Sequence, residues 1–328
     1  MIKKFGKTAI IIIFVSIFLL GIILSFFIGY NYNNPTQNKK IENHESGFKY
    51  ISPLLECENS LPLNYNYSKL KTEISNLIEA KISSKDVGTI SLYFRDLNNG
   101  PWIGINEKDE FSPASLLKVP LMIAYLKLAE GDSTLLAKKL VVGNYQTDMY
   151  PNILPAKTAT PGLSYTIDEL LTYMIEYSDN SAANTLLANI PENDLANIYT
   201  DFNLKVPGSG DTENFMTVTE YSSFFRILYN ASYLNRDMSE KALEMLALSQ
   251  FNQGIKSGLP SNIKVADKFG ERIFNDTKQL HDCGIIYLND NNNYLLCIMT
   301  KGDDFKKMET TISDISNSIY TRMLTFTK

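Results

Sequence analysis

Helical and strand-like segments occur in long separate blocks along this chain, and that order restricts the fold. A predicted helix starting at Tyr67 is followed by two predicted strands, Thr89–Asp96 and Trp102–Asn106, joined by a turn at Leu97–Gly100. A long middle segment has helical character, and three more strands and a helix follow. We therefore predict an α+β fold: an antiparallel sheet of about five strands, flanked by N- and C-terminal helices, with an inserted all-helical subdomain.

The C-terminal block carries the remaining strands. We expect them at Lys264–Phe269, Cys283–Leu288 and Tyr294–Met299, followed by a helix from about Asp304 to Leu324. The second and third strands are separated by an Asn- and Asp-rich turn, which is typical of a hairpin.

The middle block contains one helix that is apolar all round. Ser115–Glu130 carries only Lys118 and Lys127 among apolar neighbours, so we expect it to be buried. Further on, Thr166–Glu169 is a capping box that opens a helix ending near Tyr177, and another helix starts at Ser181.

An apolar run near the N-terminus predicts a membrane anchor. Residues 9–29 contain 21 uncharged residues, enough to cross a bilayer, and lysines precede them. The prediction is a cytoplasmic tail (1–8), a single-pass anchor in the cell membrane (9–29), a linker (30–66) and an extracytoplasmic domain (67–328). A cleaved signal peptide is the alternative.

Composition excludes some partners and cofactors. The net charge is −5, and basic residues form no dense block beyond the N-terminus, which argues against nucleic acid as a partner. No spacing of Cys and His suggests a metal, and nothing indicates an organic cofactor. Cys283 and Cys297 are equidistant from Asp290 and either pair across the hairpin or remain free thiols.

Ser115-Leu116-Leu117-Lys118 is the first of three short motifs that together suggest an active site. Ser-x-x-Lys also occurs at Ser68–Lys71 and Ser261–Lys264, so context matters. Ser115 opens the buried helix, where free N–H groups would stabilise an oxyanion. Lys118, one turn on and desolvated, would have a lowered pKa and accept the serine proton. The alternative is a serine N-cap with a lysine that reaches solvent.

Ser178-Asp179-Asn180 and Lys268-Phe269-Gly270 are the other two motifs. The first lies on the predicted turn between helices, where Ser178 could relay a proton and Asn180 could hold a substrate amide, although such residues also serve simply to end and cap helices. In the second, Lys268 would place positive charge beside Ser178, and Gly270 would allow close approach. Its alternative is an ordinary strand end.

Other routes to hydrolysis find little support. The histidines are His44 and His281, and only His281 could serve a Ser-His-Asp triad. The chain has no Gly-x-Ser-x-Gly elbow and no Gly-rich phosphate loop.

From about Tyr67 to the C-terminus the sequence resembles the class A β-lactamases and their penicillin-binding relatives. The motif set of that family is Ser-x-x-Lys, Ser-Asp-Asn and Lys-Thr-Gly, here in the same order. The surroundings 113–121 and 265–268 are also similar to the family pattern.

The resemblance implies a role for each motif residue. Ser115 would be the acylated nucleophile, Lys118 its base or proton relay, and Ser178 the proton carrier to the leaving nitrogen. Asn180 would contact a substrate amide, and Lys268 would supply charge for a substrate carboxylate. The backbone N–H groups of Ser115 and Glu271 would form the oxyanion hole next to Gly270.

Two features depart from the family pattern. Phe269 stands where the family has a hydroxyl, and a phenyl ring cannot hydrogen-bond a carboxylate unless Arg272 compensates. The family's loop glutamate, in a Glu-x-x-Leu-Asn run, is absent. Glu192 comes too early and looks like the first turn of a helix, and the surroundings of Glu213 do not match.

The expected function is therefore a membrane-anchored serine hydrolase that opens a β-lactam or related amide through an acyl-Ser115 intermediate. Two alternatives remain: a peptidase of the penicillin-binding type acting on peptidoglycan stem peptides, and a catalytically silent cell-wall binding domain.

Overall fold

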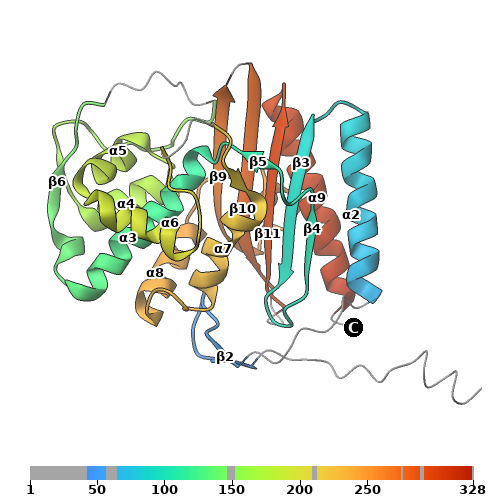
Figure 1. Cartoon of the computed structure of the whole chain (residues 1–328), viewed down its shortest axis with the longest axis horizontal. Helices are drawn as coiled ribbons and strands as arrows, with labels where there is room; N and C mark the ends of the chain where they lie inside the picture. Colours follow the sequence, from blue (N-terminus) through green and yellow to red (C-terminus); the bar gives the residue numbers. More distant parts are fainter. Residues whose placement is uncertain are drawn as a thin grey trace, which may run out of the picture. The chain divides into compact units, whose positions relative to one another are not determined.

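A five-stranded antiparallel sheet forms the centre of the protein. The structure is a computed structural model, and it describes residues 43–56, 65–145, 152–208, 213–274, 276–288 and 292–326. The strand order is β4-β3-β11-β10-β9 (Figure 1). The strand bounds are β3 (Thr89–Asp96), β4 (Trp102–Ile105), β9 (Lys264–Phe274), β10 (Thr277–Tyr287) and β11 (Tyr294–Gly302). The predicted α+β architecture is confirmed.

Two long helices cover one face of this sheet. They are α2 (Tyr65–Ser83) and α9 (Phe305–Phe326), and they come from opposite ends of the described domain (Figure 1). Apolar residues of both helices, such as Ile74 and Ile312, are buried against sheet residues such as Ile298. The predicted flanking helices therefore share one core with the sheet because each has an apolar stripe.

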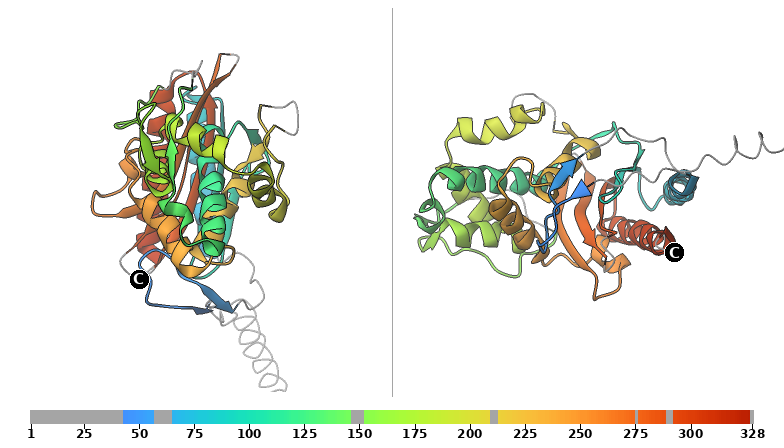
Figure 2. Two further views of the ribbon diagram at one scale, coloured as in Figure 1. Left: turned by 90° about the vertical axis from the view of Figure 1, so that its left-hand side faces the viewer. Right: turned by 90° about the horizontal axis from the view of Figure 1, so that it is seen from below.

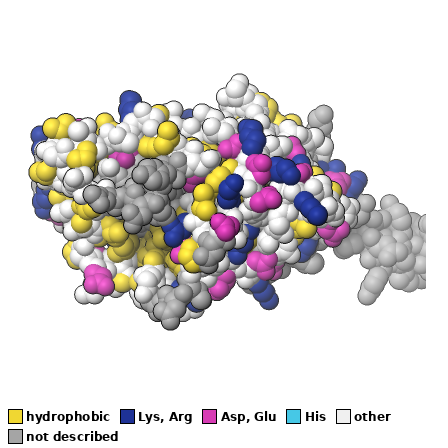
Figure 3. Space-filling model, turned by 90° about the horizontal axis from the view of Figure 1, so that it is seen from above, with side chains coloured by type: hydrophobic (Ala, Val, Ile, Leu, Met, Phe, Trp, Pro, Cys, Tyr) yellow, Lys and Arg dark blue, Asp and Glu magenta, His cyan; other side chains and the backbone are white. Residues whose placement is uncertain are grey.

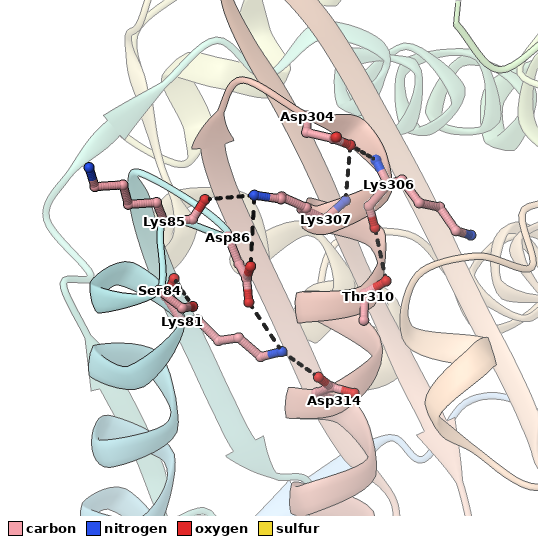
Figure 4. Close-up of polar contacts among 9 residues, drawn as sticks. All are labelled: Lys81, Ser84, Lys85, Asp86, Asp304, Lys306, Lys307, Thr310 and Asp314. Atoms are coloured by element: carbon pink, nitrogen blue, oxygen red, sulfur yellow. Dashed lines mark hydrogen bonds and ion pairs between the residues drawn. The ribbon is translucent and has the colours of Figure 1, made fainter.

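Charged side chains connect α2 and α9 at the surface (Figure 4). Lys81 pairs with Asp314 at 2.6 Å and with Asp86 at 3.8 Å, and Lys307 reaches Asp86 at 4.0 Å. Exposed ion pairs of this kind contribute about 0–1 kcal/mol each to stability. The buried apolar stripes of α2 and α9 therefore contribute most to the packing of these helices.

Helices fill the opposite face, as Figure 2 shows in the view from below. This helical half comes from the middle of the chain, between β4 and β9, and it corresponds to the predicted inserted subdomain. Its helices are α3 (Lys118–Gly131), α4 (Ile167–Glu176), α5 (Asn180–Asn189), α6 (Glu192–Asp201), α7 (Val218–Tyr229) and α8 (Arg236–Ala247). Short elements accompany these helices. β5 (Glu110–Phe111) and η1 (Ala114–Leu117) come before α3, η2 (Leu135–Ala137), β6 (Lys139–Val141), β7 (Ser164–Thr166) and β8 (Met216–Thr217) lie between the helices, and η3 (Ile255–Gly258) follows α8.

Part of the predicted linker is folded onto the domain. Strands β1 (Asn43–His44) and β2 (Leu54–Glu56) pair, and the carboxylate of Glu240 on α8 accepts three backbone N–H groups, those of residues 49–51. Tyr50 and Ile51 are buried. The compact unit begins at Glu42 rather than at Tyr67. Tyr50 and Ile51, two apolar residues within a polar segment, join the hydrophobic cluster of the helical half, and periodicity does not reveal such a contact.

The three C-terminal strands are longer than predicted. β9 continues past Gly270 to Phe274, and β10 starts at Thr277 instead of Cys283. Polar residues and glycine weaken the strand signal there, but cross-strand pairing of Glu271 with Leu280 extends the ladder. Cys283 faces Cys297 across β10 and β11 and forms a disulfide, which is one of the two alternatives.

The predicted membrane anchor at 9–29 lies outside the described residues. Within the part of the chain that the structure describes, no helix combines the length and apolar character needed to span a bilayer.

Candidate active site

The three motifs meet between the sheet edge and the helical half. Strand β9 is the edge strand that carries Lys268 and Gly270, and the turn η1 with helix α3 lies beside it (Figure 1). The α4–α5 turn brings Ser178 and Asn180 to the same place, because Lys118 bonds both of them. Residues 60 or more positions apart thus form one cluster.

Ser115 lies on a 3-10 turn and not, as expected, at the first turn of an α-helix. The turn spans Ala114–Leu117, and α3 begins at Lys118. Pro120 lacks the N–H that would continue an α-helical ladder back to Leu116, which accounts for the tighter turn. Ala114 has φ +49°, a strained value for a residue with a side chain. The residue immediately before the candidate nucleophile therefore has a strained backbone conformation.

Gly270 allows the strand to pack against this turn. A Cβ at Gly270 would lie 2.8 Å from the carbonyl oxygen of Pro113 and 3.1 Å from the nitrogen of Leu116. No larger residue fits without moving backbone atoms. The predicted close approach at Gly270 is therefore made by the chain itself, next to Ser115.

Lys118 is buried and fully engaged with the α4–α5 turn. Its Nζ lies 2.5 Å from the carbonyl oxygen of Ser178, 3.1 Å from Ser178 Oγ and 2.8 Å from Asn180 Oδ1. Burial, and secondarily the charge of Lys268, hold the pKa of Lys118 well below its usual value. An amine with a lowered pKa is a competent base. Within the described chain, Ser115 Oγ makes no hydrogen bond, so the Lys118 contact is to Ser178.

Ser178 lies in a turn that Asp179 holds in place. Ser178 has φ +56°, and Asp179 is the N-cap of α5. The buried Asp179 carboxylate accepts backbone N–H groups from Ser181 and Ala182 at 3.1 Å and from Ala159 at 2.9 Å. The capping role was expected from the sequence, but the third bond, from Ala159 in the β6–β7 connection, was not. Asp179 therefore positions Ser178 and Asn180.

Lys268 shares Ser178 with Lys118. Its Nζ lies 2.9 Å from Ser178 Oγ and 3.0 Å from the carbonyl oxygen of Phe269. Burial lowers the pKa of Lys268 to about 7, while the carboxylates of Asp267 and Asp282 act in the opposite direction. One hydroxyl thus lies between two amines of lowered pKa, which is an arrangement suited to moving a proton.

Asp267 lies on β9 and Asp282 lies opposite Phe269 on β10, and the sequence reasoning missed both. They are fully buried; Lys256 pairs with Asp267 at 2.7 Å, and the N–H of Ile255 donates to Asp282 at 2.7 Å. Burial raises the pKa of both carboxyl groups. Asp267 directly precedes Lys268, which was the one available signal.

Phe269 faces away from the α4–α5 turn. Its ring stacks on Phe251 at 4.2 Å with an interplanar angle of 19°, in the core on the α9 side of the sheet. Arg272 is the residue that could compensate for the missing hydroxyl. Its Nε donates to the carboxylate of Glu213 at 2.5 Å. Glu213 also accepts from the hydroxyl of Ser112 at 3.1 Å.

Glu271 extends from β9 toward the segment that starts at residue 152. Its Oε1 accepts the N–H of Ile153 at 2.9 Å. Burial raises the pKa of the Glu271 carboxyl group. Glu192, by contrast, lies in the first turn of α6, as expected. Among the described residues, no carboxylate is hydrogen-bonded to Lys118 or Ser115. The oxyanion hole of backbone N–H groups from Ser115 and Glu271 stays a prediction.

His281 has a structural place below the nucleophile turn. Its Nε2 lies 2.9 Å from the carbonyl oxygen of Ser112, and its Nδ1 accepts the N–H of Thr300 at 3.3 Å. Burial lowers the pKa of His281 to about 4, so the ring is neutral at pH 7. These bonds use both ring nitrogens, which leaves none to activate Ser115. In the described ranges, no group of three or more His, Cys, Asp or Glu side chains is placed to hold a metal.

Charged and apolar side chains lie on different parts of the face seen from above (Figure 3). Charges of both signs gather over the sheet and its two helices, whereas apolar side chains are more frequent on the side of the helical half. Large exposed apolar residues include Val141, Leu154 and Leu163, all in or between β6 and β7. Charges of mixed sign give no strong single-sign field.

Comparisons with known proteins agree with the geometry. A family model described as "Beta-lactamase enzyme family" matches residues 69–323. Beta-lactamase VEB-1 of Pseudomonas aeruginosa is 25% identical over 247 residues, covering 69% of this chain and 80% of that protein. The structure of PBP-A superposes with a TM-score of 0.66 at 18% identity, covering 81% of this chain and all of that chain. A class A beta-lactamase from Mycobacterium abscessus gives 0.65 at 18% identity, covering 79% and 100%.

Proposed function

The chain belongs to the beta-lactamase enzyme family, and we propose that it opens β-lactam or related amide bonds through an acyl-enzyme on Ser115. It is a serine hydrolase of the class A β-lactamase type. The observation that carries the proposal is the hydrogen-bonded chain from Lys118 through Ser178 to Lys268, one turn from Ser115. Those contacts join all three motifs in one site.

The acylation step uses this chain of residues in order. Ser115 Oγ attacks the carbonyl carbon, and its proton passes to the neutral amine of Lys118, directly or through Ser178. The carbon–nitrogen bond then breaks, and the nitrogen takes a proton from Ser178 Oγ, which Lys118 replaces. In a β-lactam the leaving nitrogen stays tethered to the acyl group. Lys268, still protonated, stabilises the negative charge that develops on Ser178 during the transfer.

Deacylation is proposed to be slow. It needs a base for water, and the two glutamates bonded near the third motif, Glu213 and Glu271, are bonded to Arg272 and to the N–H of Ile153. This favours a second candidate, a peptidase of the penicillin-binding type acting on peptidoglycan stem peptides, in which β-lactams leave a persistent adduct.

The anchor and the location are part of the proposal. We propose that residues 9–29 hold the domain at the outer side of the cell membrane, on the strength of their length, their apolar character and the preceding lysines. Fractionation of cells that express the full chain, with an alkaline wash, tests it: release of the intact protein into the soluble fraction would contradict the anchor.

The proposal is tested by the intact mass of residues 42–328, the compact unit, mixed with excess penicillin G. We expect an adduct of the mass of the whole drug that is absent from Ser115→Ala. A persistent adduct supports the peptidase type, and released hydrolysed drug supports the lactamase type. Absence of both adduct and hydrolysis in the unaltered protein overturns the proposal.

The acylation rate is expected to depend on pH in a bell shape. Lys118 must be neutral, so the rate rises with pH through its lowered pKa; Lys268 must be charged, so the rate falls above about pH 7. The second-order rate constant of adduct formation, measured from pH 5 to 10, checks this. Lys268→Arg, whose charge persists, should remove the alkaline limb. A rate that keeps rising beyond pH 9 in the unaltered protein would contradict the assignment.

A further inference from the structure

Residues 153–159, here called the strap, pass from one face of the sheet to the other across its edge strand. Ile153 packs against the apolar cluster that the sheet shares with α2 and α9, whereas Ala159 is buried in the cluster of the helical half. Strand β9 is the last strand on this side of the sheet, so the strap crosses the β9 edge. Ser115 lies at the same edge, because Gly270 of β9 packs against the η1 turn.

Each end of the strap is bonded to one wall of the acylation site. The N–H of Ile153 donates to Glu271 Oε1 at 2.9 Å, on the face of β9 that also carries Phe269. The N–H of Ala159 donates to Asp179 Oδ2 at 2.9 Å, in the turn between α4 and α5. Asp179 is the middle residue of the second motif, and Glu271 directly follows the third. The strap therefore bridges the two walls that meet at the acylation site.

The two ends of the strap are held unequally, and the part between them is exposed. Ala159 is buried, and Lys157 nearby places its Nζ 5.3 Å from the centroid of the Tyr177 ring. Ile153 is only half-buried, and most residues between the two ends are exposed, including Leu154 at 76%. A segment with few buried contacts opens at a low free-energy cost. Opening is therefore expected at the Ile153 end, with the Ala159 end as the hinge.

We propose that the strap is a gate on the acylation site, closed by the bond between Ile153 and Glu271, which must break before an acyl donor reaches Ser115. The expected oxyanion hole uses the backbone N–H of Glu271, whose side chain holds the strap, so donor and strap meet at one residue. A donor binds only the open fraction of the molecules, and that fraction scales the acylation rate. Ile153 is thus a positioning residue that acts through closure. This inference rests on the proposed acylation of Ser115.

Ile153→Pro on residues 42–328 tests the gate, because proline lacks the N–H that closes it and Glu271 stays unaltered. The measurement is the rate of adduct formation with penicillin G, read by intact mass. We expect it to rise about fivefold, the factor that corresponds to the net contribution of one typical hydrogen bond. Unfolding would lower the rate, so a rise cannot come from a damaged fold.

Leu154→Pro is the matched control, the same change one residue further along the strap. The Leu154 N–H makes no hydrogen bond within the part of the chain that the structure describes, so the rate should stay within about twofold of the unaltered protein. A rate in Ile153→Pro no higher than that in Leu154→Pro would overturn the gate while leaving acylation intact.

Amide hydrogen exchange reports closure without any acyl donor. In the unaltered protein we expect the Ile153 N–H to exchange at least about tenfold more slowly than the Leu154 N–H. The Ala159 N–H should stay protected in Ile153→Pro, since the hinge bond to Asp179 is retained. An unprotected Ile153 N–H shows an open strap and contradicts the gate even where penicillin G acylates Ser115. If penicillin G forms no Ser115-dependent adduct, the proposed function fails, and the gate on acylation fails with it.

Discussion

Replacing Lys118 by methionine is expected to slow acylation of Ser115 by about 10³-fold, within the range of 10²–10⁴ that general base catalysis contributes. The reason is the site of the amine: it is buried, its pKa is lowered, and it lies 3.1 Å from the Ser178 hydroxyl, three residues along the chain from Ser115. Methionine has a similar length and no polar atom to desolvate. The measurement is the second-order rate of adduct formation with a β-lactam, read by intact mass.

Stability distinguishes this effect from unfolding. Methionine removes a desolvated amine but leaves the Ser178 carbonyl and Asn180 Oδ1 without their donor, so we expect opposing changes that leave the free energy of unfolding within about 2 kcal/mol. Lys127→Met is the matched control, because Lys127 lies on the same helix and is exposed; its acylation rate should be unchanged. A Lys118→Met protein that is acylated at the normal rate would exclude Lys118 as the base.

Asp179→Ala is expected to destabilise the protein by about 2–4 kcal/mol. Loss of an N-cap costs about 1 kcal/mol, and leaving the buried N–H of Ala159 without an acceptor costs about 1–3 kcal/mol more. The Asp179 carboxylate is buried and accepts three backbone N–H groups. Because the same carboxylate holds the turn with Ser178 at φ +56°, acylation should also slow. Urea unfolding followed by circular dichroism gives the free energy.

Asn235→Ala provides the comparison for this prediction. Asn235 is also an N-cap, of α8, but within the described part of the chain its side chain accepts a single backbone N–H, that of Met238. We expect a loss of about 1 kcal/mol there and a normal acylation rate. Asp179→Asn keeps an acceptor oxygen, so its loss of unfolding free energy should fall between those of Asn235→Ala and Asp179→Ala. If Asp179→Ala costs no more than Asn235→Ala, the bond to Ala159 does not contribute to stability.

Several parts of the site followed from local patterns. The capping box at Thr166 opens α4 as expected, and the turn between α4 and α5 carries Ser178. The strand Thr89–Asp96 has the predicted bounds. These features depend on residues within one or two turns of each other, where periodicity, caps and turn chemistry act, so one sequence is sufficient to recognise them.

Other parts could not be read from local patterns. The end of β9 was placed at Phe269 although pairing with β10 carries it to Phe274, and residues 43–56 were assigned to a linker although they fold onto α8. Both errors have the same cause. A polar or mixed segment becomes ordered when backbone groups and carboxylates distant in the sequence satisfy its hydrogen bonds. The sequence of the segment itself does not identify those partners.

The sequence by itself determined the order of helices and strands, the family resemblance and the residues that we propose to react. Tertiary structure alone decided their environment: the burial that lowers the pKa of Lys118 and Lys268, the hydroxyl of Ser178 between them, and the direction of Phe269 and Glu271. Propensity is a local property, whereas desolvation and charge interaction depend on which remote residues pack around a group. Local sequence therefore specifies which chemical groups the site contains, whereas the tertiary packing sets their pKa values.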